Sequence, residues 1–327
     1  MLTISVAMCT YNGSRFLPDQ LESIANQRRP PDELVVCDDK SSDNSPDLVE
    51  EFSRRVPFSV RLIRNDQNVG STRNFERAVS LCRGAIVALA DQDDIWYPDK
   101  LTMLEQAFLR SDKIVGAFSD ADIVDDMGHP LQQRLWSSMG FDAGEQRRFQ
   151  EDGWAVLLRH PVVTGATMAF RKEMSELLFP IPGRTIHDRW LSFLLAVAGP
   201  MTLLREPLMR YRIHRAQQVG VKPQGIKERF HLALQRNETF YAEEVALFRA
   251  LSARLNRFSM ELKNSDLVMA EINRKIRHLE NRVGLRRANA ARISEVFQEV
   301  RNRGYWKYSA GWQSVAKDLF LPERTTK

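Results

Sequence analysis

The chain has 327 residues, 43% hydrophobic and 27% charged, which is the composition of an ordinary globular protein. No apolar run is long enough for a membrane-spanning helix, and the first residues predict a strand rather than a signal peptide. The net charge of +5 is uneven, because residues 221–327 hold 21 Lys and Arg against 12 Asp and Glu. This asymmetry predicts two modules, 1–224 and 225–327.

The cysteines argue for a reducing compartment. Cys9, Cys37 and Cys82 are odd in number, widely spaced and set in apolar segments. That pattern fits neither a disulfide framework nor a zinc site, and it favours a cytoplasmic location.

Strands and helices alternate over the first hundred residues. Short continuous apolar strands separated by helices of about ten residues predict a mainly parallel sheet covered on both faces. In such sheets the ligand lies beyond the carboxyl ends of the strands. The expected strands are 4–12, 33–39, 58–65 and 84–94, and the expected helices are 16–27, 45–55, 71–82 and one after Pro98.

The later chain changes character. GAFSDADIVD and VVTGATMAFRK read as further strands, and 188–199 as an apolar helix. Beyond about residue 225 the apolar spacing is helical throughout, with a turn and helix start at 264–266. These residues predict a helical hairpin or a long coiled pair.

An acidic cluster follows the fourth strand. In ADQDD, Asp91 and Asp93 are two residues apart on an extended segment and can face a common point. Paired carboxylates suit Mg²⁺ or Mn²⁺, which can hold the phosphates of a nucleotide. The alternative is a solvated turn in which one Asp caps the next helix.

Two more polar segments follow predicted strands. In VVCDDKSSDNS, Asp38 or Asp39 can reach a base edge or a ribose, although turn chemistry alone also explains such residues. In RNDQNVGSTRNF, Gly70 permits close backbone approach, and Arg73 at a helix start favours phosphate. An ordinary loop with a surface arginine is the alternative there.

Four motifs in order carry a resemblance. TYN, VxxDDxSxD, NxGxxRN and DQDDxWxPDKL match family 2 glycosyltransferases over roughly residues 5–101. The DQDD-IW form with NVGxxRNF looks most like the bacterial rhamnosyltransferase branch. The resemblance implies the GT-A fold, an α/β Rossmann-like domain with a mainly parallel sheet flanked by helices, here followed by an all-helical C-terminal module.

The resemblance also implies roles for individual residues. Asp188 matches the general base, with a helix N-cap as the alternative, and His187 stands where the family often has Glu. The donor-binding positions are Tyr11, Asn12, Asp38, Asp39, Gly70, Arg73, Asp91 and Gln92. The metal positions are Asp91, Asp93 and His214, with Asp94 as a second choice; for His214 a plain surface histidine is the alternative. The acceptor side is Thr164, Gly165, His187 and Trp190.

These roles imply an inverting, metal-dependent glycosyltransferase. It moves a sugar from a dTDP- or UDP-sugar donor, with rhamnose as the first candidate, to a glycan or polyprenyl-linked acceptor in surface polysaccharide or lipopolysaccharide synthesis. A sugar nucleotidyltransferase is disfavoured because TYNGSRF has one glycine and not a Gly-rich loop. A non-catalytic carbohydrate- or partner-binding protein is the alternative from another class.

The basic helical tail admits several interpretations. It can pack on the catalytic domain, pair with a second copy, or attach to an anionic membrane at the inner face of the plasma membrane. The membrane interpretation rests on aromatic residues interleaved with lysines, Trp306, Tyr308, Trp312 and Phe320. No nucleic-acid-binding motif supports a nucleic-acid partner.

Overall fold

The computed structural model describes residues 1–183, 185–215, 217, 238–284 and 292–320. The chain divides into two compact units, residues 1–153 with 162–222 and residues 154–161 with 223–327. The predicted domain boundary after residue 224 lies outside the described residues, so that division stays a prediction.

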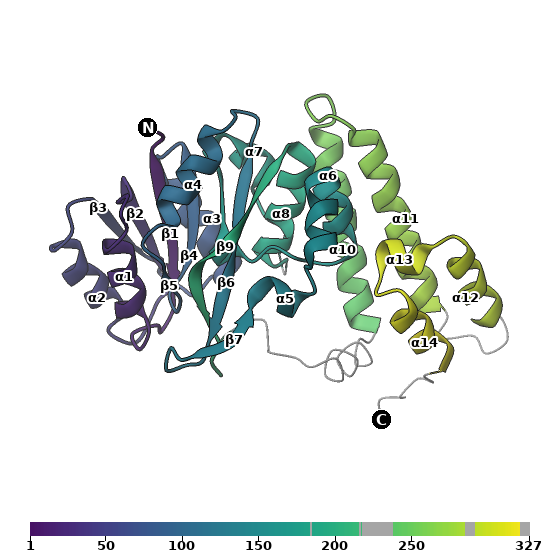
Figure 1. Ribbon diagram of the computed structural model, residues 1–327, viewed down its shortest axis with the longest axis horizontal. Helices are drawn as coiled ribbons and strands as arrows, with labels where there is room; N and C mark the ends of the chain where they lie inside the picture. The colour runs from purple at the N-terminus through teal and green to yellow at the C-terminus, as the bar shows by residue number, and fades with distance from the viewer. Residues whose placement is uncertain (184, 216, 218–237, 285–291, 321–327) are drawn as a thin grey trace. The chain divides into compact units, whose positions relative to one another are not determined.

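Within the described residues, the first unit contains one nine-stranded sheet with the order β3-β2-β1-β4-β8-β6-β9-β5, and β7 pairs with β6 (Figure 1). The strands are β1 Ile4–Thr10, β2 Glu33–Asp38, β3 Ser59–Arg64, β4 Ile86–Asp91, β5 Ile95–Trp96, β6 Gly116–Val124, β7 Pro130–Arg134, β8 Met168–Arg171 and β9 Met201–Arg212.

The parallel half of the sheet is the one predicted from the apolar runs. β1 pairs in parallel with β2 and β4, and β2 pairs in parallel with β3. Every residue of β1 and β2 is buried, as expected of strands covered on both faces. The three cysteines are free and buried in this region. The carboxyl ends of β1, β2 and β4 therefore lie along one edge of the sheet, here called the rim.

Beyond β4 the sheet is mixed. β8 enters from the short 3₁₀ turn η1 (Gly165–Thr167) and runs antiparallel to both β4 and β6. β6 therefore runs in the same direction as β4, and β9 is parallel to β6. β5 and β7 are antiparallel to their neighbours. The predicted mainly parallel sheet is therefore confirmed, with β5, β7 and β8 as its antiparallel strands, and β6 presents its carboxyl end to the same rim.

Helices pack on both faces of the parallel half. Helices α1, α2 and α4 share one hydrophobic core with alternate residues of β1, β2 and β4. Helix α3 packs against β1 and β2 from the other side. Pro18 and Pro46 stand in the first turns of α1 and α2, where the fixed φ of proline suits a helix start. The helices of the first unit are α1 Leu17–Ala25, α2 Ser45–Ser53, α3 Ser71–Leu81, α4 Lys100–Leu109, α5 Leu135–Met139, α7 Ser175–Leu178 and α8 His187–Ala198, with a second 3₁₀ turn η2 Lys172–Met174; α6 Ala143–Arg159 has a non-helical residue at Asp152 and continues into the second unit.

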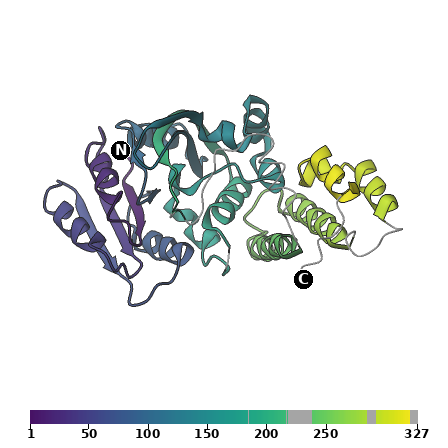
Figure 2. The same ribbon diagram turned by 90° about the horizontal axis from the view of Figure 1, so that it is seen from below.

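The second unit contains only helices and the turns between them in its described residues. α10 and α11 lie side by side, as Figures 1 and 2 both show, which confirms the predicted hairpin. Asn264 has a φ of 62° in the connecting turn, and α11 begins at the next residue. No described helix is both long enough and apolar enough to cross a bilayer. The helices are α10 Glu238–Arg257, α11 Ser265–Gly284, α12 Arg292–Arg301, α13 Gly304–Tyr308 and α14 Trp312–Phe320.

Candidate active site

The three acidic or polar motifs of the first hundred residues meet at the rim. In the strand register Thr10 lies opposite Asp38, and Cys9 lies opposite Asp91. Tyr11 and Asp39 therefore follow neighbouring strand ends, beside the last residue of β4. Parallel pairing has brought together segments that are separated by about thirty and about fifty residues in the sequence.

The two adjacent aspartates after β2 organise two different loops. Asp38 is 1% exposed and accepts hydrogen bonds from Thr10 Oγ1 (2.9 Å) and from the backbone N–H of Ser41 (2.9 Å). Asp39 is 3% exposed and accepts from the backbone N–H groups of Val69 and Gly70, both at 2.8 Å. Asp38 thus holds the turn before α2, and Asp39 holds the loop before α3.

The loop held by Asp39 shapes the start of α3. Gly70 has a φ of 82°, a left-handed conformation that favours glycine, and it immediately precedes the helix. Arg73 lies in the first turn, is half-exposed, and forms an ion pair with Glu76 at 2.8 Å. The Arg73 guanidinium is thus accessible beside a helix N-terminus, although it is shared with a carboxylate.

Gln92 fixes the segment after β1. Its side-chain oxygen accepts from the Tyr11 N–H at 2.8 Å, and its side-chain nitrogen donates to the Tyr11 carbonyl at 3.1 Å. A Cβ at Gly13 would overlap the Gln92 amide. Asn12 adopts a φ of 47° and accepts from the Ser42 N–H at 2.8 Å. Tyr11 itself is 41% exposed at the rim.

The acidic cluster after β4 is buried and paired with a histidine. Asp93 Oδ2 lies 2.7 Å from His214 Nε2. Burial, and then the Asp93 carboxylate, raises the pKa of Asp91 to about 7. The Arg212 N–H donates to Asp94 Oδ1 at 3.1 Å, whereas Asp94 Oδ2 is buried without a hydrogen-bond partner. Among the described residues, Asp93 is the one carboxylate of these three that forms an ion pair, and the crowding of the three carboxyl groups disfavours their ionisation.

A buried lysine stands behind these carboxylates. Lys100 is fully buried, donates to the Ala166 carbonyl at 2.6 Å and lies 4.0 Å from the centroid of the Trp96 ring. Burial lowers the pKa of Lys100 to about 7, although Asp94 and Asp91 act in the opposite direction. The sequence carries one signal for this residue, its place in the PDKL segment, and a lysine at the start of a helix is more often exposed than buried.

The predicted base lies in a tight group with His187 and Gly165. His187 Nε2 is 2.7 Å from Asp188 Oδ1, and the imidazole packs on Phe75 with ring centroids 4.4 Å apart. Burial alone would raise the pKa of Asp188, but His187 and then the Gly165 backbone amide outweigh burial and lower it. Burial alone would lower the pKa of His187, but the Asp188 carboxylate outweighs burial and raises it. The pair is therefore an ionised carboxylate in close electrostatic contact with an imidazole, although neither His187 Nε2 nor Asp188 Oδ1 makes a hydrogen bond within the described residues.

Electrostatics link this pair to the acidic cluster. Asp188 contributes to the raised pKa of Asp91, and Asp91 in turn contributes to the raised pKa of His187. Asp91 and Asp188 are almost a hundred residues apart in the sequence, and the fold brings them close enough for each to affect the ionisation of the other's neighbourhood.

Two residues of the predicted acceptor side differ in their surroundings. Thr164 is half-buried directly before η1, and its carbonyl accepts from the Thr167 hydroxyl at 2.7 Å. Trp190 is 1% exposed, and its indole N–H donates to the Leu178 carbonyl at 2.7 Å. Trp190 is therefore a core residue that joins α8 to α7 and presents no surface to an acceptor.

The residues at the cluster fit a hard divalent cation by their chemistry. Among the described residues no three His, Cys, Asp or Glu side chains converge as a ready metal site. The close Asp93–His214 pair, the raised pKa of Asp91 and the buried Asp94 oxygen without a hydrogen-bond partner nevertheless make this a place where a cation would be stabilised. Carboxylate oxygens are the ligands that Mg²⁺ and Mn²⁺ prefer.

Comparison with known proteins identifies the family. The model of glycosyl transferase family 2 matches residues 5–178, which contain the rim motifs. The chain belongs to glycosyl transferase family 2. An uncharacterized glycosyltransferase of Nostoc sp. is 31% identical over 224 residues, 66% of each chain. The dTDP-rhamnosyl transferase RfbG of Shigella flexneri is 25% identical over 258 residues, 75% of this chain and 84% of that protein.

Solved structures of low sequence identity share the fold. The crystal structure of S. aureus TarS 1–349 in complex with UDP-GlcNAc has a TM-score of 0.54 at 17% identity, covering 96% of this chain and 90% of that one. The mannosyltransferase PcManGT of Pyrobaculum calidifontis, in complex with GDP-Man and Mn²⁺, has a TM-score of 0.50 at 16% identity, covering 97% and 85%. The chain of glycosyl transferase family 2 described here thus has the GT-A fold, with helices after it. Its match spans 66% or less of the first curated relatives, among them an uncharacterized Mycobacterium bovis protein at 59%.

Proposed function

We propose that this member of glycosyl transferase family 2 transfers a sugar from a nucleoside diphosphate donor to a hydroxyl group of a glycan or polyprenyl-linked acceptor. The observation that carries the proposal is that two carboxylate–histidine pairs, Asp93 with His214 and Asp188 with His187, lie close enough at the rim for both carboxylates to raise the pKa of Asp91. The cluster of buried carboxyl groups suits a cation that holds the diphosphate leaving group. The ionised Asp188 carboxylate beside it suits an attacking hydroxyl.

The donor is bound by residues of three strand ends. Tyr11, whose backbone Gln92 holds, offers its exposed ring to a base, and Asn12 lies beside it. Asp38 and Asp39 act mainly through the loops they order, because both carboxylates are buried and hydrogen-bonded.

The diphosphate faces the cluster. Arg73 and the backbone after Gly70 favour negative charge at the start of α3. Asp91, Asp93 and His214 would hold Mg²⁺ or Mn²⁺, which neutralises charge on a leaving diphosphate when it is bound. The structure of PcManGT with GDP-Man and Mn²⁺, and the naming of RfbG as a dTDP-rhamnosyl transferase, support a nucleotide-sugar donor.

Asp188 acts as the general base. Its pKa is lowered, so the carboxylate is ionised at neutral pH and can accept the proton of an acceptor hydroxyl. His187 and the Gly165 amide fix the carboxylate before the acceptor arrives. Attack of that hydroxyl oxygen on the face opposite the leaving diphosphate inverts the anomeric centre in one displacement. Rhamnose from dTDP-rhamnose is the first donor to test, followed by UDP-hexoses.

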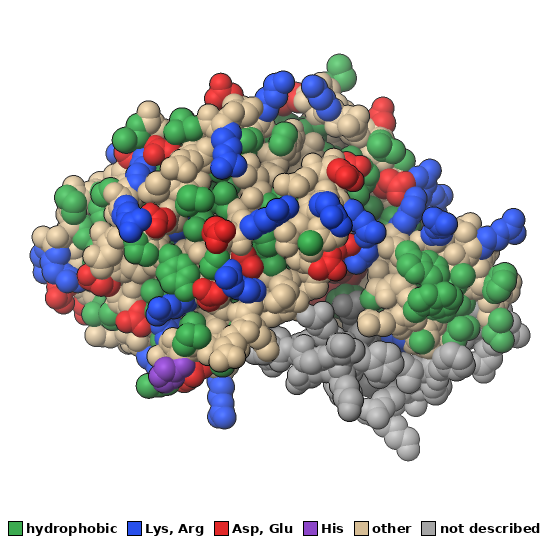
Figure 3. Space-filling view, in the orientation of Figure 1, with side chains coloured by type: hydrophobic (Ala, Val, Ile, Leu, Met, Phe, Trp, Pro, Cys, Tyr) green, Lys and Arg blue, Asp and Glu red, His purple; other side chains and the backbone are tan. Residues whose placement is uncertain are grey.

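An acceptor on a lipid would place the reaction at the inner face of the plasma membrane. Hydrophobic side chains gather over α12 to α14 on the face shown in Figure 3. Ile293 and Phe297, four residues apart on α12, are 69% and 72% exposed, and Trp312 is 67% exposed. These side chains, in a module of positive net charge, support peripheral attachment to anionic lipid of an otherwise cytoplasmic enzyme.

Two aromatic residues of the predicted membrane surface do not belong to this group. Tyr308 is 6% exposed and its hydroxyl donates to Glu271 at 2.6 Å, and the Phe320 side chain lies outside the described residues. Co-sedimentation with phosphatidylglycerol and with phosphatidylcholine vesicles tests the attachment. Attachment would be supported if the wild type sediments with the anionic vesicles only and Phe297→Ser sediments with them less. It would be contradicted if neither the wild type nor Phe297→Ser sediments with the anionic vesicles.

The donor is tested by thermal unfolding with a panel of nucleotide sugars, each with and without Mn²⁺. A ligand at 100 times its Kd stabilises the folded state by about 2.7 kcal/mol, which is measurable. We expect a metal-dependent shift with one donor, and we expect Asp93→Ala to abolish the metal dependence. If the thermal shift of Asp93→Ala depends on metal as much as that of the wild type, Asp93 does not belong to the cation site. If no donor shifts the wild type, the transferase proposal is contradicted.

A further inference from the structure

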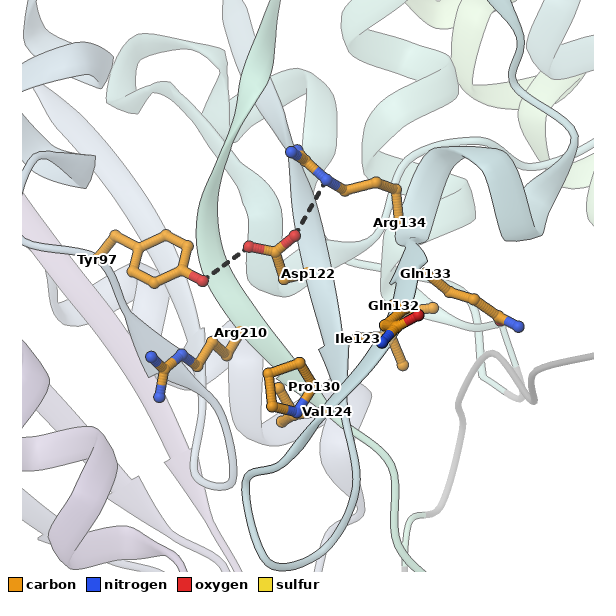
Figure 4. A pocket seen from close by; sticks show the side chains of 9 residues that line it. All are labelled: Tyr97, Asp122, Ile123, Val124, Pro130, Gln132, Gln133, Arg134 and Arg210. Atoms are coloured by element: carbon orange, nitrogen blue, oxygen red, sulfur yellow. Dashed lines mark hydrogen bonds and ion pairs between the residues drawn. The ribbon is translucent and has the colours of Figure 1, made fainter.

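A pocket of about 370 Å³ opens beside the rim, away from the residues assigned above (Figure 4). Its volume lies within the range of small-molecule sites. It lies wholly in the first unit, between the segment after β5, the carboxyl end of β6, the hairpin strand β7 and the carboxyl end of β9. Tyr97, Asp122, Pro130, Gln132, Arg134 and Arg210 are among its lining residues.

Asp122 stands at the centre of the pocket wall and is already compensated. The Tyr97 hydroxyl donates to Asp122 Oδ2 at 2.7 Å, and Arg134 Nε lies 3.0 Å from Asp122 Oδ1, as the dashed lines of Figure 4 show. Both carboxylate oxygens thus have a partner within the protein. The acid serves to orient Tyr97 and Arg134 and does not require a cation.

Arg210 differs from Arg134 in its partners. Across the sheet it lies opposite Asp122 on β6 and Ile95 on β5, and its guanidinium carbon is 5.7 Å from the centroid of the Tyr97 ring. Within the described parts of the chain, no carboxylate forms an ion pair with Arg210. The lining residues of the pocket therefore carry one more positive than negative side chain, and Arg210 interacts with the Tyr97 hydroxyl instead of a carboxylate. Among the described residues, the side-chain amide of Gln132 forms no hydrogen bond.

The pocket and the acidic cluster share one edge of the sheet. Ala88 of β4 and Ala117 of β6 both lie opposite Ala169 of β8, so Asp120 stands level with Asp91, and Asp122 lies two residues farther toward the rim. Two strand spacings separate β4 from β6, which is about 10 Å.

Strand β9 connects the two sites directly. Arg212, two residues after Arg210, donates its N–H to Asp94 and its Nε to the Asp93 carbonyl. Two residues of extended chain span about 7 Å. An acceptor longer than one sugar could therefore place its hydroxyl at Asp188 and another unit against Arg210.

We propose that this pocket binds an anionic sugar unit of the acceptor glycan, one or more units away from the attacking hydroxyl. That the bound glycan is an acceptor rests on the proposed function; that the pocket binds an anionic sugar does not. A guanidinium fork matches a carboxylate or a phosphate group through two parallel hydrogen bonds, and the Tyr97 hydroxyl and Gln132 amide can serve sugar hydroxyls. The anion is either the carboxylate of a uronic acid unit or a phosphate substituent on the glycan.

The test measures binding of three matched disaccharide sets, neutral, uronic-acid-containing and phosphorylated, by titration calorimetry. Wild-type protein, Arg210→Ala, Arg210→Lys and Arg205→Ala are compared; Arg205 is an exposed arginine of the same strand and serves as the control. We expect an anionic set to bind, Arg210→Ala to bind it about 10- to 100-fold more weakly, and Arg205→Ala to match wild type. Arg210→Lys, which keeps the charge without the fork, should fall between.

Which anionic set binds distinguishes the uronic acid from the phosphate. Equal affinity of wild type and Arg210→Ala for every set would overturn the proposal, as would binding of the neutral set alone or of none. Thermal shifts with nucleotide sugars on the same wild-type sample test the transferase separately. Protein that binds an anionic disaccharide through Arg210 but no nucleotide sugar would retain the pocket and lose the proposed function.

Discussion

The Gly165 backbone lies directly against the Asp188 carboxylate. A methyl group built at Gly165 would stand 2.5 Å from Asp188 Oδ1 and 2.7 Å from His187 Nε2, closer than real Cβ contacts. Because neither neighbour is on a free surface, the pair must move if residue 165 gains a side chain. Glycine is therefore required here for space, and its role is to let a backbone amide reach the base.

Gly165→Ala should displace Asp188 and His187 and lower kcat by at least 10-fold, while the nucleotide-sugar Kd remains within about 2-fold. A shift of about 1 Å at a catalytic group is enough for such a loss. Steady-state kinetics and donor titration check this. Gly183→Ala is the matched control, since nothing lies within 4 Å of a Cβ there; equal kcat for both variants would contradict the account of Gly165.

Asp188→Asn removes the proposed base with little change in volume. We expect kcat to fall by about 10²–10⁴, the usual contribution of general-base catalysis. Donor binding should persist, because the proposed donor-binding residues follow strand ends or lie at the start of α3, whereas Asp188 lies on α8. Turnover near the wild-type value in a folded variant would exclude Asp188 as the base.

Gln92→Ala should weaken donor binding through Tyr11. The substitution removes both hydrogen bonds that fix the Tyr11 backbone, each worth about 0.5–1.5 kcal/mol at most in this exposed position. We expect the donor Kd to rise about 3- to 30-fold and the melting temperature to change little. Gly13→Ala, which forces the same amide aside, should give a similar rise; an unchanged Kd in both variants would show that Gln92 has no positioning role.

Lys100→Met tests the buried charge behind the acidic cluster. The variant keeps most of the side-chain volume but removes an ammonium near Asp91 and Asp94, and breaking such a buried charge arrangement costs about 3–5 kcal/mol. In EDTA its melting temperature should fall. The stabilisation gained on adding Mn²⁺ should exceed that of wild type, because the cation then replaces lost positive charge. An equal or smaller gain would mean that Lys100 and the cation do not share the cluster.

Acid should loosen the second unit before the first. His278 Nδ1 lies 2.6 Å from Glu299 Oε2, and burial lowers the pKa of His278 from 6.5. The folded state then binds fewer protons than the unfolded state, so its stability falls as the pH drops below about 6.5. The pKa of Glu299 is also lowered, despite burial, by His278, so its contribution is lost at still lower pH.

Hydrogen exchange at pH 7.5 and pH 5.5, corrected for intrinsic rates, measures this loss. We expect protection in α11 and α12 to fall at pH 5.5 while β1 and β4 remain protected. His278→Gln should reduce the difference between the two pH values. Uniform loss of protection across both units would contradict a local cause at His278.

The order of strands and helices along the first hundred residues follows from the sequence alone. Continuous apolar runs such as that of β4 can be buried on both faces only in a covered sheet, and Gly70 and Pro98 punctuate the pattern. Four local motifs in that order were enough to indicate the family, because each one occupies a loop at a strand end. The helical hairpin of α10 and α11 was equally predictable from its 3-4 spacing.

Tertiary structure alone decided which charges face one another. Nothing in the sequence relates Lys100 to Asp94, Gln92 to Gly13, or Arg210 to Asp122, because these relationships depend on strand pairing and on which side chains lose water. The direction of β8 likewise depends on long-range pairing. Because β8 runs antiparallel to both β4 and β6, β6 runs in the same direction as β4 and ends at the rim. Local patterns report whether a segment can be buried; the partners of a buried charge are set by non-local packing, where a group without a partner is costly.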